Sequence, residues 1–164
     1  MAEERPQQTR SADIPGMSPE DIKELLRHGK VLYLTHLTRE GWPMVTPMFY
    51  CMIGEELYTS TVRGRVKEIA YRRDNRMSAS LSREDTTLAT EQALTIKGRA
   101  QILEDEDAVR RVCQGYVDKY WGGFSKREQE RYFQTLYTKD RLAIKLIPEK
   151  IMSWDVAKLE YHKR

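Results

Sequence analysis

Apolar and polar residues alternate most regularly over residues 93–103. Leu94, Ile96, Ala100 and Ile102 fall on one side of the alternation, and Thr95, Lys97, Arg99 and Gln101 fall on the other. A period of two places successive side chains on opposite faces of a strand. Gly98 interrupts the apolar series, which indicates a bulge, a bend or the close approach of another group. The segment is therefore predicted to be a strand with one buried and one exposed face.

Five further segments have the apolar, β-branched and aromatic character of strands. They are residues 31–37, 44–52, 56–60, 76–81 and 141–155, the last interrupted at Pro148. Short turns containing Gly41 and Gly54 join the first three of these segments, so neighbouring strands are expected to be antiparallel. The total is six strands.

Helical spacing and capping signals predict four helices, over residues 18–28, 65–73, 105–121 and 125–137. Ser18 before Pro19 is an N-cap with proline at the first helical position, and Ser125 with Glu128 forms a capping box. In the helix over residues 65–73, the residues expected to face inward are Val66, Ile69 and Ala70. Six antiparallel strands and four helices predict a mostly β protein with α-helices, a small barrel with the helices packed outside it.

A chain of 164 residues is long enough for one domain with a substantial core. Residues 1–16 are polar and interrupted by proline, and they are predicted to be a disordered leader before a folded domain over residues 17–164. The formal charge of +3 requires no nucleic-acid partner, and no apolar run suits a signal peptide or a membrane span. Cys51 and Cys113 match no metal or redox spacing, which favours a reduced, cytoplasmic compartment.

Hydroxyl and basic residues gather where the third strand ends and the second helix begins. Tyr58, Thr59, Ser60 and Thr61 end the strand, and the basic residues Arg63, Arg65 and Lys67 follow within six residues. Hydroxyl donors, cations and the free N–H groups of a helix N-terminus together satisfy a phosphate. The alternative is a solvated basic helix start with capping hydroxyls, and the spacing alone does not choose between the two.

A second candidate is Val45-Thr46-Pro47, because proline cannot donate to a sheet ladder and belongs on an edge or a bulge. Backbone groups left free there could face a flat heterocycle, although an ordinary edge proline gives the same pattern. Trp154 at the end of the last strand could stack on a ring, contact a partner subunit or pack in the core. No metal site is expected, because the three histidines share no ligand spacing with the cysteines.

The order of these motifs resembles a known family. The segments are G-x-P-x-V-T-P-M-F-Y, E-L-Y-T-S-T, G-R-V-K-x-I-x-x-R-R-D-N-R, K-G-R-A and P-x-K-I-x-S-W-D, within about residues 18–156. Together they resemble the pyridoxamine 5'-phosphate oxidase-like split β-barrel flavoproteins, and more narrowly the flavin- or deazaflavin-dependent oxidoreductase branch. The resemblance implies a six-stranded antiparallel split β-barrel with peripheral helices, a homodimer, and a cofactor in a groove between the subunits.

The resemblance also implies roles for individual residues. The implied contacts are Thr59, Ser60 and Thr61 with the cofactor phosphate, Arg65 and Lys67 with its charge, Val45, Thr46 and Pro47 with the isoalloxazine ring, and Trp154 closing the ring pocket. The arginine and histidine arrangement that binds substrate phosphate in the pyridoxamine phosphate oxidases proper is missing near the C-terminus, which reads A-K-L-E-Y-H-K-R. Vitamin B6 oxidation is therefore not expected.

The leading functional hypothesis is a cytoplasmic oxidoreductase that uses FMN to transfer hydride or electrons to or from a small organic substrate. One alternative is the deazaflavin coenzyme F-420, whose longer acidic tail Lys97 and Arg99, or Arg72 and Arg73, could hold. Another is a non-catalytic flavin- or heme-binding protein, with His28 and His36 as candidate axial ligands. A single-strand nucleic-acid binder is disfavoured, because the basic residues of the alternating strand are not interleaved with aromatic residues.

Overall fold

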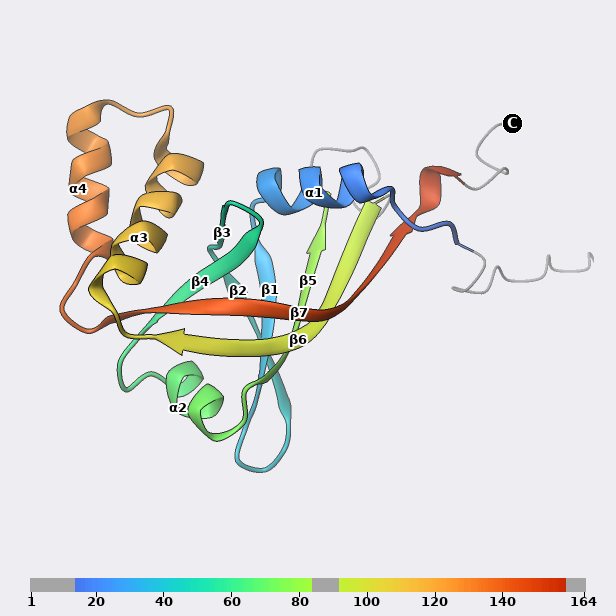
Figure 1. Ribbon diagram of the computed structural model, residues 1–164, viewed down its shortest axis with the longest axis horizontal. Coiled ribbons are helices and arrows are strands. Elements are labelled where there is room, and N and C mark those ends of the chain that lie inside the picture. Colours follow the sequence, from blue (N-terminus) through green and yellow to red (C-terminus); the bar gives the residue numbers. More distant parts are fainter. Residues whose placement is uncertain (1–13, 84–91, 159–164) are drawn as a thin grey trace, which may run out of the picture.

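The computed structural model describes residues 14–83 and 92–158 of the chain. The described elements are α1 (Pro19–His28), β1 (Leu32–Leu37), β2 (Pro43–Met48), β3 (Cys51–Ile53), β4 (Glu56–Val62), α2 (Val66–Arg73), β5 (Arg76–Ser82), β6 (Gln92–Leu103), α3 (Glu106–Trp121), α4 (Lys126–Leu136), β7 (Arg141–Asp155) and the short 3-10 helix η2 (Val156–Lys158) (Figure 1). Residues 1–13 of the predicted leader lie outside the described residues. None of the described helices is long and apolar enough to cross a membrane.

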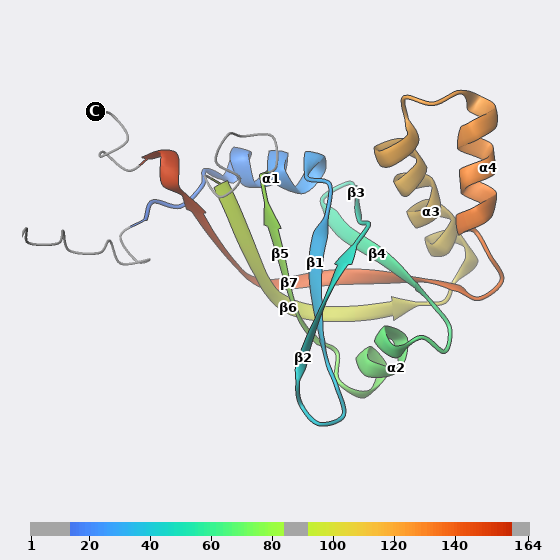
Figure 2. The ribbon, with the colours of Figure 1, turned by 180° about the vertical axis from the view of Figure 1, so that it is seen from behind.

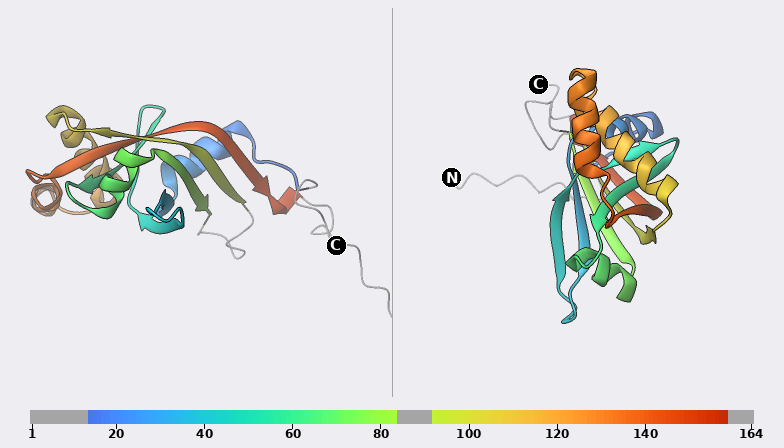
Figure 3. Two further views of the ribbon diagram at one scale, coloured as in Figure 1. Left: turned by 90° about the horizontal axis from the view of Figure 1, so that it is seen from below. Right: turned by 90° about the vertical axis from the view of Figure 1, so that its left-hand side faces the viewer.

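All seven strands join one antiparallel sheet in the order β2-β1-β5-β6-β7-β4-β3. Although β2 and β3 lie at opposite edges of this sheet, only Phe49 and Tyr50 connect them in sequence. The sheet must therefore curl until its two edges approach each other, which gives a half-barrel with helices around it (Figures 1 and 3). The predicted split-barrel fold is confirmed in this form.

The predicted count of six strands is wrong, because the expected strand over residues 44–52 is two strands, β2 and β3. The chain leaves the ladder at Phe49 and Tyr50. The backbone N–H of Tyr50 donates to the hydroxyl of Tyr120 in α3 (3.1 Å), and the carbonyl of Phe49 accepts from the hydroxyl of Thr59 in β4 (2.7 Å). These contacts replace ladder hydrogen bonds at the point where the chain crosses from one sheet edge to the other.

The long strands β6 and β7 run side by side along the molecule and carry the curvature of the sheet (Figures 1 and 3). The predicted alternation of β6 is confirmed, with buried Leu94 and Ile96 followed by exposed Lys97. A register shift occurs between Lys97 and Gly98, as the glycine predicts. A Cβ atom at Gly98 would overlap the carbonyl oxygen of Ile147, so the close approach of β7 excludes a side chain there.

Two hydrophobic cores hold the fold together. The larger fills the half-barrel and includes Leu34, Leu81, Ile96 and Ile144, all at most 1% exposed. The smaller lies beneath α3 and α4 and includes Val112, Tyr116 and Phe133. The N-cap predicted at Ser18 and the capping box predicted at Ser125 and Glu128 are both present, and Ser18 also forms a capping box with Asp21. α3 and α4 therefore attach to the sheet through a core of their own, whereas α1 and α2 contribute Leu25, Leu26 and Tyr71 to the core of the half-barrel.

The prediction for the inward face of α2 is only partly right. Ala70 is buried, but Val66 and Ile69 are 69% and 45% exposed. The inward positions are taken by Tyr71, whose hydroxyl donates to a backbone carbonyl of β1 (2.9 Å), and by Glu68, which accepts from a backbone N–H before the helix (3.1 Å). These polar anchors fix the rotation of the helix and leave two apolar side chains on the surface.

Candidate functional site

The edge of β2 that faces away from β1 is open. The hairpin hydrogen bond from Thr38 N to Trp42 O (2.8 Å) sets the alternation of the β1–β2 ladder. Along the register from that pair, Pro43, Val45 and Pro47 direct their backbone atoms away from β1. Since proline has no N–H, Val45 supplies the single backbone donor of this stretch. The edge is therefore closed to a further strand but offers one donor and three carbonyl oxygens to a ligand.

The edge of β4 is also open, because β3 pairs with only its first three residues. The hydrogen bond from Arg63 N to Asp140 O (2.8 Å) sets the alternation of the β4–β7 ladder. Along this register, Ser60 and Val62 direct their backbone atoms away from β7, so their N–H groups face the open edge.

We call the region between the open edges of β2 (residues 43–48) and β4 (residues 59–62) the seam. Its two sides meet at Phe49, whose carbonyl oxygen accepts a hydrogen bond from the hydroxyl of Thr59. Figure 2 shows β2 and β4 diverging from this meeting point, with α2 beside the far end of β4. Two of the predicted motifs, Val45-Thr46-Pro47 and Thr59-Ser60-Thr61, thus form opposite sides of one feature.

The three hydroxyl residues of β4 do not share one environment. Thr59 and Thr61 lie on one face of the strand and Ser60 on the other, because successive side chains alternate. All three are at most 5% exposed. The hydroxyl of Thr59 donates to the Phe49 carbonyl and accepts from the hydroxyl of Tyr116 (3.2 Å). Thr59 therefore holds the β2–β3 connection in this structure, while Ser60 lines a cavity described below.

The basic residues around α2 differ in whether carboxylates neutralise them. Arg63 and Arg72 both bind Glu104 (2.7 and 2.5 Å), and these arginines lower the pKa of Glu104 to about 2. Arg65 and Lys67 pair with no carboxylate within residues 14–83 and 92–158. Two neighbouring cations are therefore left available to an external anion.

The start of α2 strengthens this anion site. Its N-cap residue, Arg65, makes no side-chain capping hydrogen bond, so the first-turn N–H groups keep their capacity for a ligand. Burial lowers the pKa of Lys67, and the nearby Arg65 lowers it further. A bound anion would relieve both costs, because it would neutralise two cations that repel each other. The structure thus supports an anion site at Arg65 and Lys67, at the end of β4.

A cavity of about 310 Å3 lies where the two sides of the seam meet. Its lining residues are Val31, Pro47, Met48, Phe49, Ser60, Tyr116, Leu136 and Arg141. It unites Pro47 and Ser60, which the sequence placed in separate motifs. Tyr116 and Arg141 were missed by the sequence analysis. Tyr116 has the helical spacing of a core residue, and no sequence signal shows that the first residue of β7 reaches the end of β2.

Trp154 lies far from the seam of its own chain. Ser60 pairs with Ala143, whereas Trp154 pairs with Ala93, 11 positions further along β7. At about 3.3 Å per residue, this separation is roughly 35 Å along the strand. Trp154 therefore cannot close a pocket formed by Val45-Thr46-Pro47 and Thr59-Ser60-Thr61 of the same chain.

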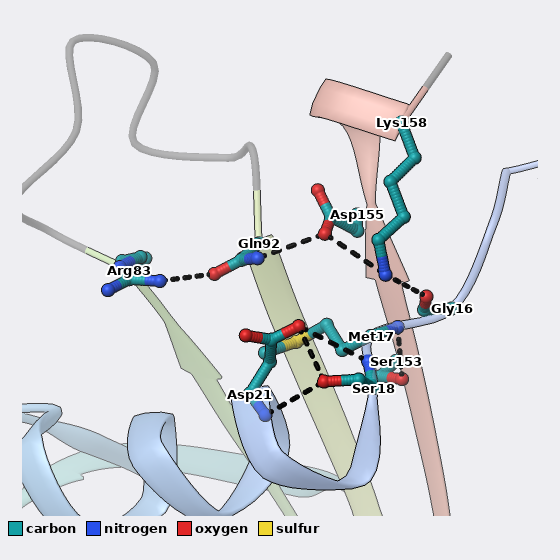
Figure 4. Close-up of polar contacts among 9 residues, drawn as sticks. All are labelled: Gly16, Met17, Ser18, Asp21, Arg83, Gln92, Ser153, Asp155 and Lys158. Atoms are coloured by element: carbon teal, nitrogen blue, oxygen red, sulfur yellow. Dashed lines mark hydrogen bonds and ion pairs between the residues drawn. The ribbon is translucent and has the colours of Figure 1, made fainter.

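A polar network fixes the end of β7 next to Trp154 (Figure 4). The buried carboxylate of Asp155 accepts from Gln92 (2.9 Å) and lies 3.4 Å from the ammonium of Lys158. Gln92 in turn accepts from Arg83 (2.6 Å), and the backbone N–H of Asp155 donates to Pro15 (2.7 Å). The ends of β5, β6 and β7 and the segment before α1 are thereby tied together, which gives Trp154 a defined position.

The candidate heme ligands differ in environment. His28 is exposed at the end of α1, whereas the imidazole of His36 is buried beside the ring of Tyr71, with ring centroids 6.3 Å apart. Neither ring nitrogen of His36 has a hydrogen-bond partner among the described residues. Burial lowers the pKa of His36, and the cations of Lys67 and Arg73 lower it further, so the imidazole is neutral near pH 7. No cluster of three metal-ligating side chains occurs in the described part of the chain.

The sequence and the fold were compared with those of known proteins. A family model described as pyridoxamine 5'-phosphate oxidase matches residues 18–146. The solved structure of a conserved hypothetical protein from Mycobacterium tuberculosis is 25% identical, with a TM-score of 0.76 over 91% of both chains. No curated protein matches the sequence.

Two more distant structures share the fold. A putative pyridoxamine 5'-phosphate oxidase from Listeria innocua is 22% identical, with a TM-score of 0.61 over 82% of this chain and 95% of that one. An F-420 reductase is 17% identical, with a TM-score of 0.56 over 79% of this chain and 94% of that one.

Proposed function

Because the chain belongs to the pyridoxamine 5'-phosphate oxidase-like family, we propose that it is a flavin-dependent oxidoreductase that binds FMN at the seam. It would transfer hydride or electrons to or from a small organic substrate. One observation carries the proposal: Arg65 and Lys67 have no carboxylate partner among the described residues and stand at an uncapped helix start beside the open edge of β4. Unpaired cations at a free helix N-terminus suit a phosphate monoester.

The FMN phosphate would lie at the start of α2. Arg65 and Lys67 balance its charge of nearly two, and the first-turn N–H groups of α2 donate to its oxygens. Of the predicted hydroxyl ligands, Thr59 donates to the β2–β3 connection and Ser60 hydrogen-bonds Tyr116, whereas the Thr61 hydroxyl has no partner among the described residues. Thr61 is therefore the best candidate for a phosphate contact.

The isoalloxazine ring would lie along Val45-Thr46-Pro47. The outward N–H of Val45 and the outward carbonyls beside it are complementary to the acceptor and donor atoms on the edge of a flavin ring. Val45 is 59% exposed and Met44 is 49% exposed, so an apolar ring would cover surface that is now in water. The flavin supplies the hydride chemistry, and these residues bind it, orient it and exclude water from one of its sides.

We propose that two copies of the chain form the complete site. Large apolar side chains on the β1–β2 hairpin are exposed, with Trp42 at 70% and Tyr33 at 44%. Because Trp154 lies roughly 35 Å along β7 from the seam of its own chain, it could close a ring pocket only in a second copy. Light scattering on the purified protein should give twice the mass of the 164-residue chain. A monomer at micromolar concentration would remove this part of the proposal.

The deazaflavin coenzyme F-420 is the second candidate, and one observation favours it. Lys97, on the exposed face of β6, has no hydrogen-bond or ion-pair partner among the described residues and lines a cavity of about 400 Å3 that could take part of an acidic tail. The arginines beside it are occupied, since Arg99 binds Glu149 (2.8 Å) and Arg76 binds Asp74 (2.6 Å). One available cation suits a polyacidic tail poorly, so FMN remains the first choice.

Titration of the ligand-free protein tests the proposal. FMN and F-420 are added separately, and binding is followed by the change in each cofactor's fluorescence. We expect saturable binding of FMN, one per chain, and weaker binding of F-420. Tight binding of F-420 alone would select the second candidate, and binding of neither would contradict both.

A cytoplasmic location suits the protein, because its two buried cysteines are free thiols.

A further inference from the structure

The cavity at the meeting point of β2 and β4 contains a cation that the proposed cofactor site does not use. Most of its wall is apolar and comes from Val31, Met48, Phe49 and Leu136. Arg141, the first residue of β7, also lines it. The guanidinium is half-buried beside this apolar wall, where an anionic ligand would supply a counter-charge.

The guanidinium of Arg141 is held in place but keeps hydrogen-bonding capacity. Its Nε donates to the carbonyl oxygen of Leu136, the last residue of α4 (2.8 Å). Its two Nη groups have no hydrogen-bond or ion-pair partner within the described ranges 14–83 and 92–158. Because its Nε is already held, the guanidinium can bind a carboxylate through its Nη groups with little further loss of side-chain freedom.

The remaining polar atoms of the cavity are already largely satisfied. The hydroxyl of Tyr116 lies 3.1 Å from the Phe49 carbonyl and 3.2 Å from the Thr59 hydroxyl. Burial raises the pKa of Tyr116, and its hydrogen bonds with Ser60, which is 5% exposed, and with Thr59 offset part of that rise. The strong donor left for a ligand is therefore the single guanidinium of Arg141, which matches a carboxylate of one negative charge better than a phosphate of nearly two.

We propose that this cavity binds a compact apolar molecule carrying one carboxylate, with the carboxylate on Arg141 and the apolar body against Met48, Phe49 and Leu136. Pro47 forms part of the same wall and belongs to the edge assigned to the flavin ring. The molecule bound here would therefore lie beside the ring, in the position of a substrate. The role of substrate rests on the proposed function. The binding of a carboxylate in this cavity does not depend on a cofactor.

Calorimetric titration with benzoate tests the site in the cofactor-free protein at low salt. Benzoate should bind once per chain, and benzyl alcohol should bind more weakly because it lacks the charge. Arg141→Gln should weaken benzoate binding by about tenfold or more, the value of one charge-assisted hydrogen bond. Arg127→Gln removes the same charge from an exposed position at the start of α4 and should leave binding unchanged.

Two outcomes would overturn the inference. Equal affinity of the wild type and Arg141→Gln for benzoate would show that Arg141 does not bind the carboxylate. Tighter binding of phenyl phosphate than of benzoate would show that the cavity prefers a phosphate. Arg141→Lys, which retains a cation, should bind between the two and guards against a folding defect, and its circular dichroism should match the wild type.

Repeating the titration with FMN present separates the inference from the proposed function. Benzoate binding unaffected by FMN would show that the cavity and the flavin site can be filled at the same time, as the inference requires. Competition between them would assign the cavity to the cofactor and overturn the inference. If no flavin binds, yet benzoate binding still depends on Arg141, the cavity proposal stands while the proposed function fails.

Discussion

Removing the two unpaired cations at the start of α2 should abolish tight cofactor binding. The change is the double substitution Arg65→Gln and Lys67→Gln, which preserves side-chain length and polarity but removes both charges. Neither residue pairs with a carboxylate in the part of the chain that the structure describes, so no buried carboxylate is left behind by the change. The fold should therefore tolerate the substitution, and the effect should appear in binding.

The magnitude follows from the two contacts that are lost. A hydrogen bond to a charged group contributes about 1.5–3 kcal/mol. Arg65 is exposed and belongs at the lower end of that range, whereas Lys67 is partly buried and belongs higher. The sum of about 3–5 kcal/mol corresponds to a weakening of FMN binding by roughly 10²- to 10³-fold or more.

The assay is a fluorescence titration of ligand-free protein with FMN at constant ionic strength. Lys126→Gln with Arg127→Gln is the matched control, because it removes two charges from the exposed start of another helix. FMN affinity of the wild type should also fall at alkaline pH, where Lys67 loses its proton, since burial and Arg65 lower its pKa. If the Arg65 and Lys67 double variant binds FMN within about twofold of the control, the phosphate assignment is refuted.

Three further predictions concern the fold around the site. Gly98→Ala should lower the free energy of unfolding by at least about 2 kcal/mol, measured by urea denaturation, because its Cβ would overlap the carbonyl of Ile147; unchanged stability would show that β7 can shift. Thr59→Val should cost about 1–2 kcal/mol in the same assay, since it removes the 2.7 Å hydrogen bond to Phe49, and a neutral result would mean that another donor replaces it. His36 should make the protein acid-sensitive: its pKa is lowered on folding, so the unfolded chain binds a proton that the folded chain does not, and stability should fall as the pH drops below about 6.5. A His36→Phe variant should lose that part of the pH dependence, and an unaltered pH profile would exclude His36 as its source.

The sequence was sufficient where a regular pattern determines structure. Alternation over residues 93–103 located β6, and the glycine within it marked the register shift. The sequence could not show that residues 44–52 form two strands, because Phe49 and Tyr50 are as suitable for a strand as their neighbours. The break depends on Tyr120 and Thr59, which approach only in the folded chain.

The candidate site shows the same limit. Cations near hydroxyl groups indicated an anion site, but the sequence could not tell which cations were already neutralised. Glu104, directly after β6, forms ion pairs with Arg63 and Arg72, whereas Arg65 and Lys67 remain available to a ligand. That choice is made by tertiary contacts between distant segments, and so is the position of Arg141 at the seam.

Native mass spectrometry of the protein, purified without added ligand, tests the central claim most directly. The account predicts a complex of two chains that carries flavin, with FMN identified by mass after the protein is denatured. A dimer that releases F-420 would show that the cofactor of this site is the deazaflavin and not FMN. A monomer that carries no ligand, and gains none when FMN is added, would contradict the account.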